Sequence, residues 1–265
     1  MSIYSDEHKS FLKKEKRFKI MVHFVQIIII VILFFIWEIL AQKGIINTFL
    51  YSSPSKIIST ITSLFNQNNL FNHIGITIYE VIISFLIASI LSFIIATLLW
   101  WNKFLSKVTE PYLTILNSLP KVALGPLIII WAGASINSII VMSLMISLFI
   151  TIINFYQSFI STNKNYITLL KSFKASKKDI FLKVIVPSNR ENIISNLKIN
   201  MSMNFIGVIM GELLVSKSGL GYLIMYGSQV FNITLVITSI VILGFLSFVL
   251  YYLINYIEKI IVKKR

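Results

Sequence analysis

Long runs of apolar residues, separated by short polar and basic segments, constrain this sequence more than any other feature. A helix needs roughly 20 residues, at about 1.5 Å each, to cross a hydrocarbon core of about 30 Å. Hydrophobic residues make up 56% of the chain and charged residues only 13%, against about a quarter in soluble domains. We therefore expect an all-α membrane protein with six transmembrane helices. The six runs lie at residues 20–40, 74–100, 110–131, 138–159, 193–215 and 235–257.

The basic residues predict how these helices are oriented. Most of the 24 Lys and Arg residues fall in segments that would lie on one side of the membrane, which the positive-inside rule assigns to the cytoplasm. We expect a multi-pass protein of the cell membrane, with both termini in the cytoplasm and membrane lipid as a partner. The expected organisation is a basic arm (1–19), a first transmembrane helix (20–41), an external loop with a short helix (42–72), a core of five further spans (73–258) that includes a cytoplasmic region (160–192), and a basic tail (259–265).

Composition and motifs argue against several kinds of chemistry. The chain has no cysteine, and its three histidines show no metal-ligand spacing, so we expect no metal site. The net charge of +14 does not come from one basic patch interleaved with aromatic residues, so we expect no nucleic-acid partner. The sequence contains neither a phosphate-binding loop nor a hydrolase motif. We therefore expect no cofactor in this chain and no enzymatic activity.

Residues 164–191 form a basic segment between two apolar runs. A capping-box pattern from Ser176 to Asp179 predicts the start of a short helix, and Pro187 is expected to end it. Helical spacing predicts an apolar face on this helix and on the one before it. These faces comprise Tyr166, Leu169, Leu170 and Phe173 on the first helix and Ile180, Phe181, Val184 and Ile185 on the second. The pattern fits either an interfacial helix pair lying on anionic lipid or a docking element for a cytoplasmic protein.

Polar residues inside the apolar runs are candidates for a solute path. The third run is interrupted by prolines, which predicts either a pore-lining helix or a bent packing helix whose lysine reaches the interface. The amides of the fifth run suit either close helix contacts or a polar lumen. Glu80, in the second run, is either a functional acid or a group that reaches headgroups or a neighbouring helix. The candidate path and gate residues are Asn117, Lys121, Asn200, Asn204 and Glu212.

Four groups of short motifs give the chain a resemblance to a known family. They are His73-Ile74-Gly75-Ile76-Thr77 with Phe85, Leu119-Pro120-Lys121-Val122-Ala123-Leu124-Gly125-Pro126-Leu127 with Trp131, Lys174-Ala175-Ser176 through Val186-Pro187, and Gly211-Glu212 with Ser218-Gly219-Leu220-Gly221-Tyr222. Through their order and spacing, over roughly residues 73–258, the chain resembles an ABC-importer permease of the binding-protein-dependent type. The resemblance is to the inner-membrane component of the nitrate, sulfonate and taurine group.

This resemblance implies a type I ABC importer permease fold that works as a homodimer, with the translocation path between the subunits. The cytoplasmic region would be the coupling region that docks on a separate ATP-binding subunit, which would bind ATP and Mg. An extracytoplasmic solute-binding protein would deliver a small solute such as nitrate, a sulfonate, taurine or a vitamin precursor. The alternative functions are a secondary transporter or channel that acts without an ATPase and a membrane-bound structural or assembly protein. The implied coupling residues are Tyr166, Thr168, Leu169, Leu170, Phe173, Lys174, Ala175, Ser176, Ile180, Phe181 and Pro187.

The chain departs from the family signature in this coupling region. The signature reads Glu-Ala-Ala, three residues, then Gly, and the corresponding positions here are Thr168, Leu169, Leu170 and Lys174. Because the acid is missing, we expect docking mainly through apolar contacts from Phe173, Ile180 and Phe181. A lysine in place of the glycine costs on the order of 1 kcal/mol if the helix ends in a left-handed conformation.

Overall fold

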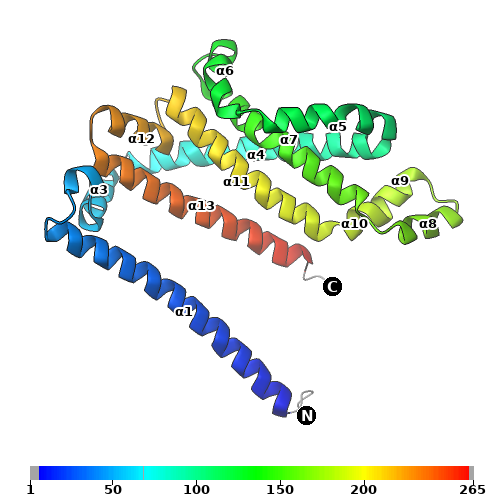
Figure 1. Ribbon diagram of the computed structural model, residues 1–265, viewed down its shortest axis with the longest axis horizontal. Helices are drawn as coiled ribbons and strands as arrows, with labels where there is room; N and C mark the ends of the chain where they lie inside the picture. The colour runs from blue at the N-terminus through cyan, green and yellow to red at the C-terminus, as the bar shows by residue number, and fades with distance from the viewer. Residues whose placement is uncertain (1–5, 68, 263–265) are drawn as a thin grey trace.

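The computed structural model describes residues 6–67 and 69–262, and the secondary structure in these ranges is helical throughout (Figure 1). The longer helices form an elongated bundle, with α3 and α12 at one end and α8 and α9 at the other. The helices are α1 (Asp6–Gln42), α2 (Thr48–Tyr51), α3 (Pro54–Asn66), α4 (Leu70–Trp101), α5 (Lys103–Ser118), α6 (Gly125–Ala132), α7 (Ile136–Ile160), α8 (Lys164–Ser172), α9 (Lys177–Ile180), α10 (Val186–Ser188), α11 (Arg190–Val215), α12 (Leu220–Gln229) and α13 (Ile233–Val262), with a 3₁₀ turn at Lys121–Leu124 and a π-helix at Phe181–Ile185.

The predicted set of six membrane spans is confirmed, with one of them broken. Within the described residues, five helices are long and apolar enough to cross a membrane: α1, α4, α7, α11 and α13. The sixth span combines α5 with the 3₁₀ turn and α6, which are bent by 83° relative to each other. The bend falls at Leu119 and Pro120, because a residue before proline is forced into an extended conformation and the proline cannot donate an amide hydrogen bond.

The centre of the bundle is a close contact between α7 and α11, with α4 packed against both. Two glycines on α11 make this contact possible. A Cβ at Gly207 would collide with the Ser143 backbone, and a Cβ at Gly211 would lie 2.9 Å from the Ile139 Cα. Small residues at such positions allow membrane helices to approach closely. The two helices therefore pack with their backbones close together.

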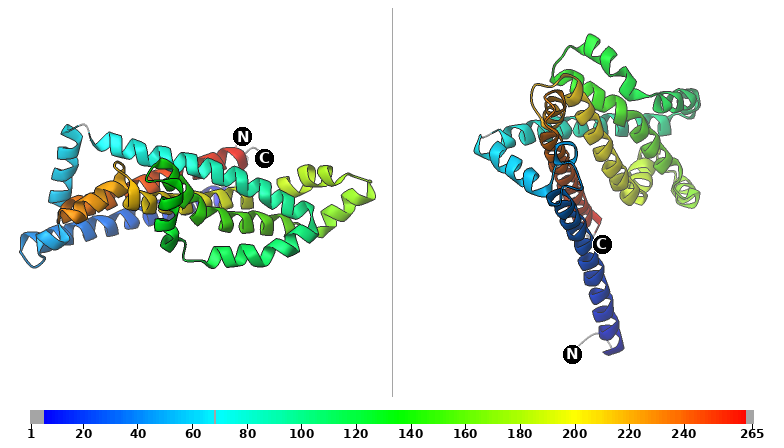
Figure 2. Two further views of the ribbon diagram at one scale, coloured as in Figure 1. Left: turned by 90° about the horizontal axis from the view of Figure 1, so that it is seen from above. Right: turned by 60° about the vertical axis from the view of Figure 1, so that its left-hand side comes forward.

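Helix α1 stands apart from the bundle and points away from it (Figure 2). Its principal described contact is with α3, and none of its apolar window is buried inside the chain. The helix begins at Asp6, so the predicted basic arm and first span form one continuous helix in the described part of the chain. An apolar helix exposed on all sides needs lipid or another chain around it.

Candidate functional site

The segment between α7 and α11 contains the predicted coupling residues and lies at one end of the bundle (Figure 1). Helix α8 exposes Tyr166, Leu169 and Phe173, and Phe173 is 75% exposed. Leu170, predicted on the same face, packs instead against an aromatic core cluster of the bundle. The segment therefore presents a narrow apolar strip, and Thr168 is exposed on another face of the same helix.

The turn after α8 is left-handed at Lys174, as the family pattern implied. The Lys174 φ angle is +56°. Two backbone hydrogen bonds close the turn, from Lys174 N to Lys171 O at 2.9 Å and from Ala175 N to Leu170 O at 3.0 Å. This is the Schellman arrangement, which normally places glycine in the left-handed position. The turn is therefore built in the usual way, with lysine bearing the conformational cost of about 1 kcal/mol.

The predicted start of α9 is confirmed, with Ser176 as its N-cap. The Asp179 amide donates to the Ser176 hydroxyl at 3.1 Å, and that hydroxyl donates to the Asp179 carboxylate at 2.5 Å. The carboxylate also pairs with Lys183 at 2.9 Å. The hydrogen bond from Ser176 and then the ammonium of Lys183 lower the pKa of Asp179 to about 2. A charged carboxylate thus fixes the first turn of this helix.

The prediction that Ile180 and Phe181 form direct docking contacts needs correction. Their side chains are only 5% and 6% exposed, because they pack into the chain's own core. The Phe181 ring lies 5.1 Å from Trp100 on α4 and 5.5 Å from Phe159 on α7. Lys177 reinforces this anchor: it donates to the Trp101 carbonyl, and its ammonium lies 5.8 Å from the Trp100 ring. The two apolar residues hold the segment against the bundle.

The prediction that Pro187 ends the second helix is wrong. The chain continues from α9 through the π-helix into α10, and Pro187 lies within this run, directly after the π-helix. The break comes at Asn189, whose side chain donates to the Thr162 hydroxyl at 2.6 Å and to the Ile185 carbonyl at 2.8 Å. Helix α11 begins at the next residue, so the single residue Asn189 joins the α8–α10 segment to a membrane span.

The predicted path residues Asn200 and Asn204 are fully buried inside the chain. The Ser143 hydroxyl on α7 donates to the side-chain oxygen of Asn204 at 2.8 Å. The Asn200 amide donates to Ser89 on α4 at 2.8 Å, and its oxygen accepts from Thr151 on α7 at 3.1 Å. These amides join α11 to α4 and α7. Of the two predicted roles, the structure shows close helix contacts, and these side chains do not line an open path.

Lys121 and Asn117 lie together at the bend of the broken span. The Lys121 ammonium donates to the Asn117 side-chain oxygen at 3.1 Å and to the Ile146 carbonyl of α7 at 3.2 Å. Both side chains are partly exposed. The contacts fix the position of the bend against α7 and leave one edge of this pair accessible.

Glu212 is not placed along a path either, because it is 1% exposed and holds a glycine turn. Its carboxylate accepts from the Thr77 hydroxyl at 2.6 Å and from the Gly221 amide at 2.5 Å. The Thr77 hydroxyl in turn accepts from the Leu220 amide at 2.9 Å. Glu80 is also buried, beside Glu212, so it lies against a neighbouring helix and not among the headgroups. These residues fasten α12 to α4 and α11.

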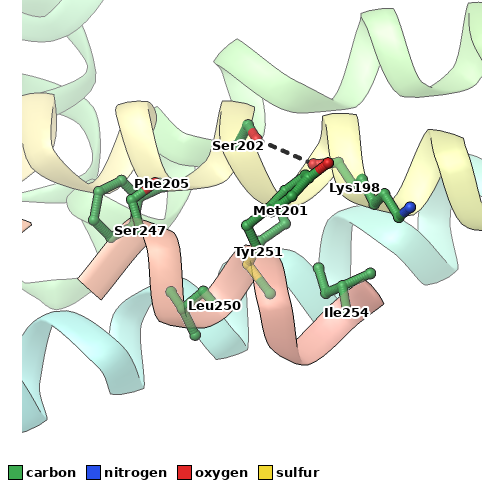
Figure 3. Close-up of a pocket in the computed structure, with 8 residues that line it drawn as sticks. All are labelled: Lys198, Met201, Ser202, Phe205, Ser247, Leu250, Tyr251 and Ile254. Atoms are coloured by element: carbon green, nitrogen blue, oxygen red, sulfur yellow. Dashed lines mark hydrogen bonds between the residues drawn. The ribbon is translucent and has the colours of Figure 1, made fainter. Parts of the chain in front are cut away.

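Sequence reasoning did not single out the exposed face of α11. Ser195, Ile199 and Ser202 share this face, and all three are exposed. Figure 3 shows the adjoining groove between α11 and α13, which includes Lys198 and Tyr251 and has space for about one water. Lys198 pairs with Glu258 of α13 at 2.5 Å. Ser195 and Ser202 are seven residues apart, and this spacing was the available sequence signal for a polar face. The prediction relied instead on the amides Asn200 and Asn204, which lie on the opposite face of the helix.

The arrangement of five spans, a broken span and an ordered segment between α7 and α11 can be compared with known proteins. The family model described as "binding-protein-dependent transport system inner membrane component" matches residues 88–265. The chain belongs to this family. It is therefore an ABC importer permease, a multi-pass transport component of the cell membrane, and the secondary-transporter alternative is not favoured.

Three relatives and one solved structure illustrate the similarity. A probable ABC transporter permease protein of Haemophilus influenzae is 29% identical over 231 residues, 87% of this chain and 94% of that protein. The formylaminopyrimidine transport permease protein ThiX of Halalkalibacterium halodurans is 29% identical over 187 residues, covering 71% and 74%. The putative aliphatic sulfonates transport permease protein SsuC of Bacillus subtilis is 26% identical over 207 residues, covering 78% and 75%. Inward-facing MetNI methionine ABC transporter matches with a TM-score of 0.58 at 19% identity, over 70% of this chain and 93% of that chain, which supports the fold of the permease.

Proposed function

We propose that this permease is driven by a separate ATP-binding subunit that docks on the α8–α10 segment. The observation that carries the proposal is the exposed apolar strip of Tyr166, Leu169 and Phe173 on a segment that is otherwise anchored in the bundle. ATP and Mg are bound by the partner, since this chain has no phosphate-binding loop. Apolar side chains at the rim of an ordered helix suit insertion into a groove of another protein.

The way the segment is anchored supports a role in transmitting movement. Phe181 fixes it to the ends of α4 and α7, and Asn189 leads directly into α11. A displacement of α8 and α9 by the ATPase is therefore passed to the spans with little slack. Rigid-body movement of packed helices is a common way to open a site alternately to each side.

The proposed assembly contains two copies of this chain, with the solute path between them. Lys121 and Asn117 at the bend, and the exposed Ser195 and Ser202 of α11, are the proposed path residues of each copy. Both described chain ends lie toward the end of the bundle that carries α8 and α9, which supports placing both termini in the cytoplasm (Figure 1). A solute-binding protein then approaches the opposite end, near α3 and α12.

The proposed solute is a small polar organic molecule, in line with the names of the two relatives assigned to formylaminopyrimidine and aliphatic sulfonates. The α11 serines offer hydrogen-bonding hydroxyls without a fixed charge. Thermal-shift measurements on the partner binding protein, with these two solute classes and nitrate as ligands, would assign the substrate.

The docking proposal is tested by replacing Phe173 with aspartate and measuring copurification of the ATPase. Phe173→Asp should abolish copurification and ATP-dependent uptake, because a charge would be buried in an apolar contact. Phe231→Asp is the matched control for copurification, because Phe231 is 73% exposed near the other end of the bundle. Unchanged ATPase binding by Phe173→Asp would refute the docking role, and undiminished uptake without any ATPase would refute ATP-driven transport.

A further inference from the structure

A cavity of about 400 Å³ lies beneath α8, between that helix and the adjoining ends of α4, α5 and α7. A single water needs about 10–15 Å³ by the same measure, and ligand pockets commonly occupy 300–1,000 Å³. The size therefore suits a small molecule or a headgroup. The cavity separates α8 from the membrane spans that the coupling segment must move.

Three lysines surround this cavity: Lys103 at the start of α5, and Lys164 and Lys171 on α8. None of the three has a carboxylate partner among the ion pairs of residues 6–67 and 69–262. Nearby Lys177 differs, because its ammonium is already engaged by the Trp101 carbonyl and the Trp100 ring. The three cavity lysines thus supply positive charge that no described acid neutralises.

The other walls of the cavity are apolar and aromatic, and they include residue types that are typical of the membrane boundary. Leu99 and Phe159 are buried at the cavity, and Trp100 and Tyr156 lie beside them. Tryptophan and tyrosine are enriched where a membrane protein passes from hydrocarbon to headgroups. A ligand that fits such a site carries an anionic head and an apolar part, as an anionic phospholipid does.

Helix α8 turns different faces to this cavity and to the outside. Lys164, Ile167, Thr168 and Lys171 line the cavity, whereas the exposed apolar strip belongs to other positions of the same helix. A ligand in the cavity and a protein on the strip would therefore contact opposite faces of α8. The cavity is a site separate from the proposed ATPase contact.

We propose that this cavity binds the phosphate headgroup of an anionic phospholipid, held by Lys103, Lys164 and Lys171. The lipid fills the space between α8 and the spans and steadies the coupling segment. Each lysine near an anionic membrane surface contributes a factor of about five in affinity, so loss of all three should weaken binding on the order of 100-fold.

Binding is measured on the full-length protein in neutral detergent, with short-chain phosphatidylglycerol, short-chain phosphatidylcholine and inorganic phosphate as separate probes. The test variant is Lys103→Gln/Lys164→Gln/Lys171→Gln. The control Lys43→Gln/Lys56→Gln/Lys217→Gln removes the same charge from exposed lysines elsewhere. Thr168→Trp fills the cavity without changing charge and is the second test variant.

The expected result is phosphatidylglycerol binding that falls about 100-fold in the cavity triple variant, weakens in Thr168→Trp and persists in the control. An equal loss in the control would overturn the proposal, because binding would then depend only on total charge. Phosphatidylcholine binding as tight as phosphatidylglycerol would overturn it as well. If inorganic phosphate binds as tightly as phosphatidylglycerol, the site recognises free phosphate, and the lipid assignment is wrong.

Discussion

The Glu212 carboxylate lies 2.5 Å from the Gly221 amide nitrogen, and this contact closes the turn between α11 and α12. The same carboxylate fills the space where a Cβ of Gly219 would stand, and Gly219 has a φ angle of +108°. The motif that joins an acid to Gly219-Leu220-Gly221 is thus one packed unit. The acid accepts hydrogen bonds from the turn, and the glycines leave room for the acid.

Adding a methyl group to this unit should be costly. In Gly221→Ala the new Cβ would lie 2.7 Å from the Glu212 Cβ, so we expect a destabilisation of about 1–3 kcal/mol. Gly244→Ala is the control, since nothing lies within 4 Å of its Cβ position, and it should be neutral or slightly stabilising. Denaturant unfolding in detergent measures both variants. Equal midpoints would contradict the proposed packing.

Replacing Glu80 or Glu212, which are both buried, with glutamine should change stability by different amounts. Two carboxyl groups in contact, with no described ion pair to a cation, cannot both be charged, so one carries a proton. Glu212 accepts from Thr77 and Gly221 and suits the charged state, whereas Glu80 has an oxygen without a partner. Glu80→Gln should therefore be tolerated, and Glu212→Gln should cost about 1–3 kcal/mol.

Two readouts check this asymmetry. Thermal unfolding in detergent gives the stability of each variant, and infrared difference spectra should lose a protonated carboxyl band in Glu80→Gln. Similar destabilisation by both glutamines would contradict the assignment of the proton to Glu80.

Alanine variants of Phe181 and Phe173 should distinguish a residue that stabilises the fold from one that contacts the ATPase. Phe181→Ala removes a buried ring between α4 and α7 and should cost about 3–5 kcal/mol. Phe173→Ala removes an exposed ring and should change stability by no more than about 0.5 kcal/mol while weakening ATPase binding. Denaturation and copurification measured on both variants test this. A strongly destabilised Phe173→Ala would show that the ring packs against this chain.

The interhelical amide network should be sensitive to truncation. Asn204→Ala leaves the Ser143 and Ser147 hydroxyls without their side-chain acceptor and should destabilise the chain by about 1–3 kcal/mol. Ser202→Ala, on the exposed face of α11, should have little effect on stability and instead change uptake if that face lines the path. Unfolding and uptake assays on the two variants distinguish the faces.

The start of α9 should weaken in acid. Because the pKa of folded Asp179 is about 2, below its ordinary 3.8, its contribution is fully present above about pH 4 and is lost as the pH falls toward 2. Hydrogen exchange of the α9 amides should therefore accelerate over that range. Asp179→Asn should exchange faster above pH 4 and converge with the wild type near pH 2, and Lys178→Gln is the control. A constant difference down to pH 2 would contradict this role.

The long apolar runs were enough to predict the membrane helices, because a helix that crosses a bilayer needs about 20 mostly apolar residues. The start of α9 was also predictable, because Ser176 and Asp179 form a local capping pattern. The bend near Pro120 was foreseen as an interruption, but its 83° angle depends on contacts with α7 that no local pattern encodes.

The direction in which polar side chains point could not be predicted in the same way. Asn200 and Ser202 differ by two positions on one helix, yet one is fully buried and the other is exposed. Both are polar, so hydropathy does not distinguish a residue that joins helices from one that faces outward. Phe173 and Phe181 present the same difficulty for apolar residues, because burial against Trp100 depends on the tertiary fold.

The glycine contacts between α7 and α11 have a consequence for the transport cycle. Helices packed this closely cannot slide past one another without a collision, so we expect no gate between these two spans. The deformable joints of the subunit must lie elsewhere, and the sharp bend before α6 is the natural one. A disulfide engineered between α7 and α11 should leave the transport rate intact, whereas a cross-link that fixes α6 to α11 should arrest the cycle.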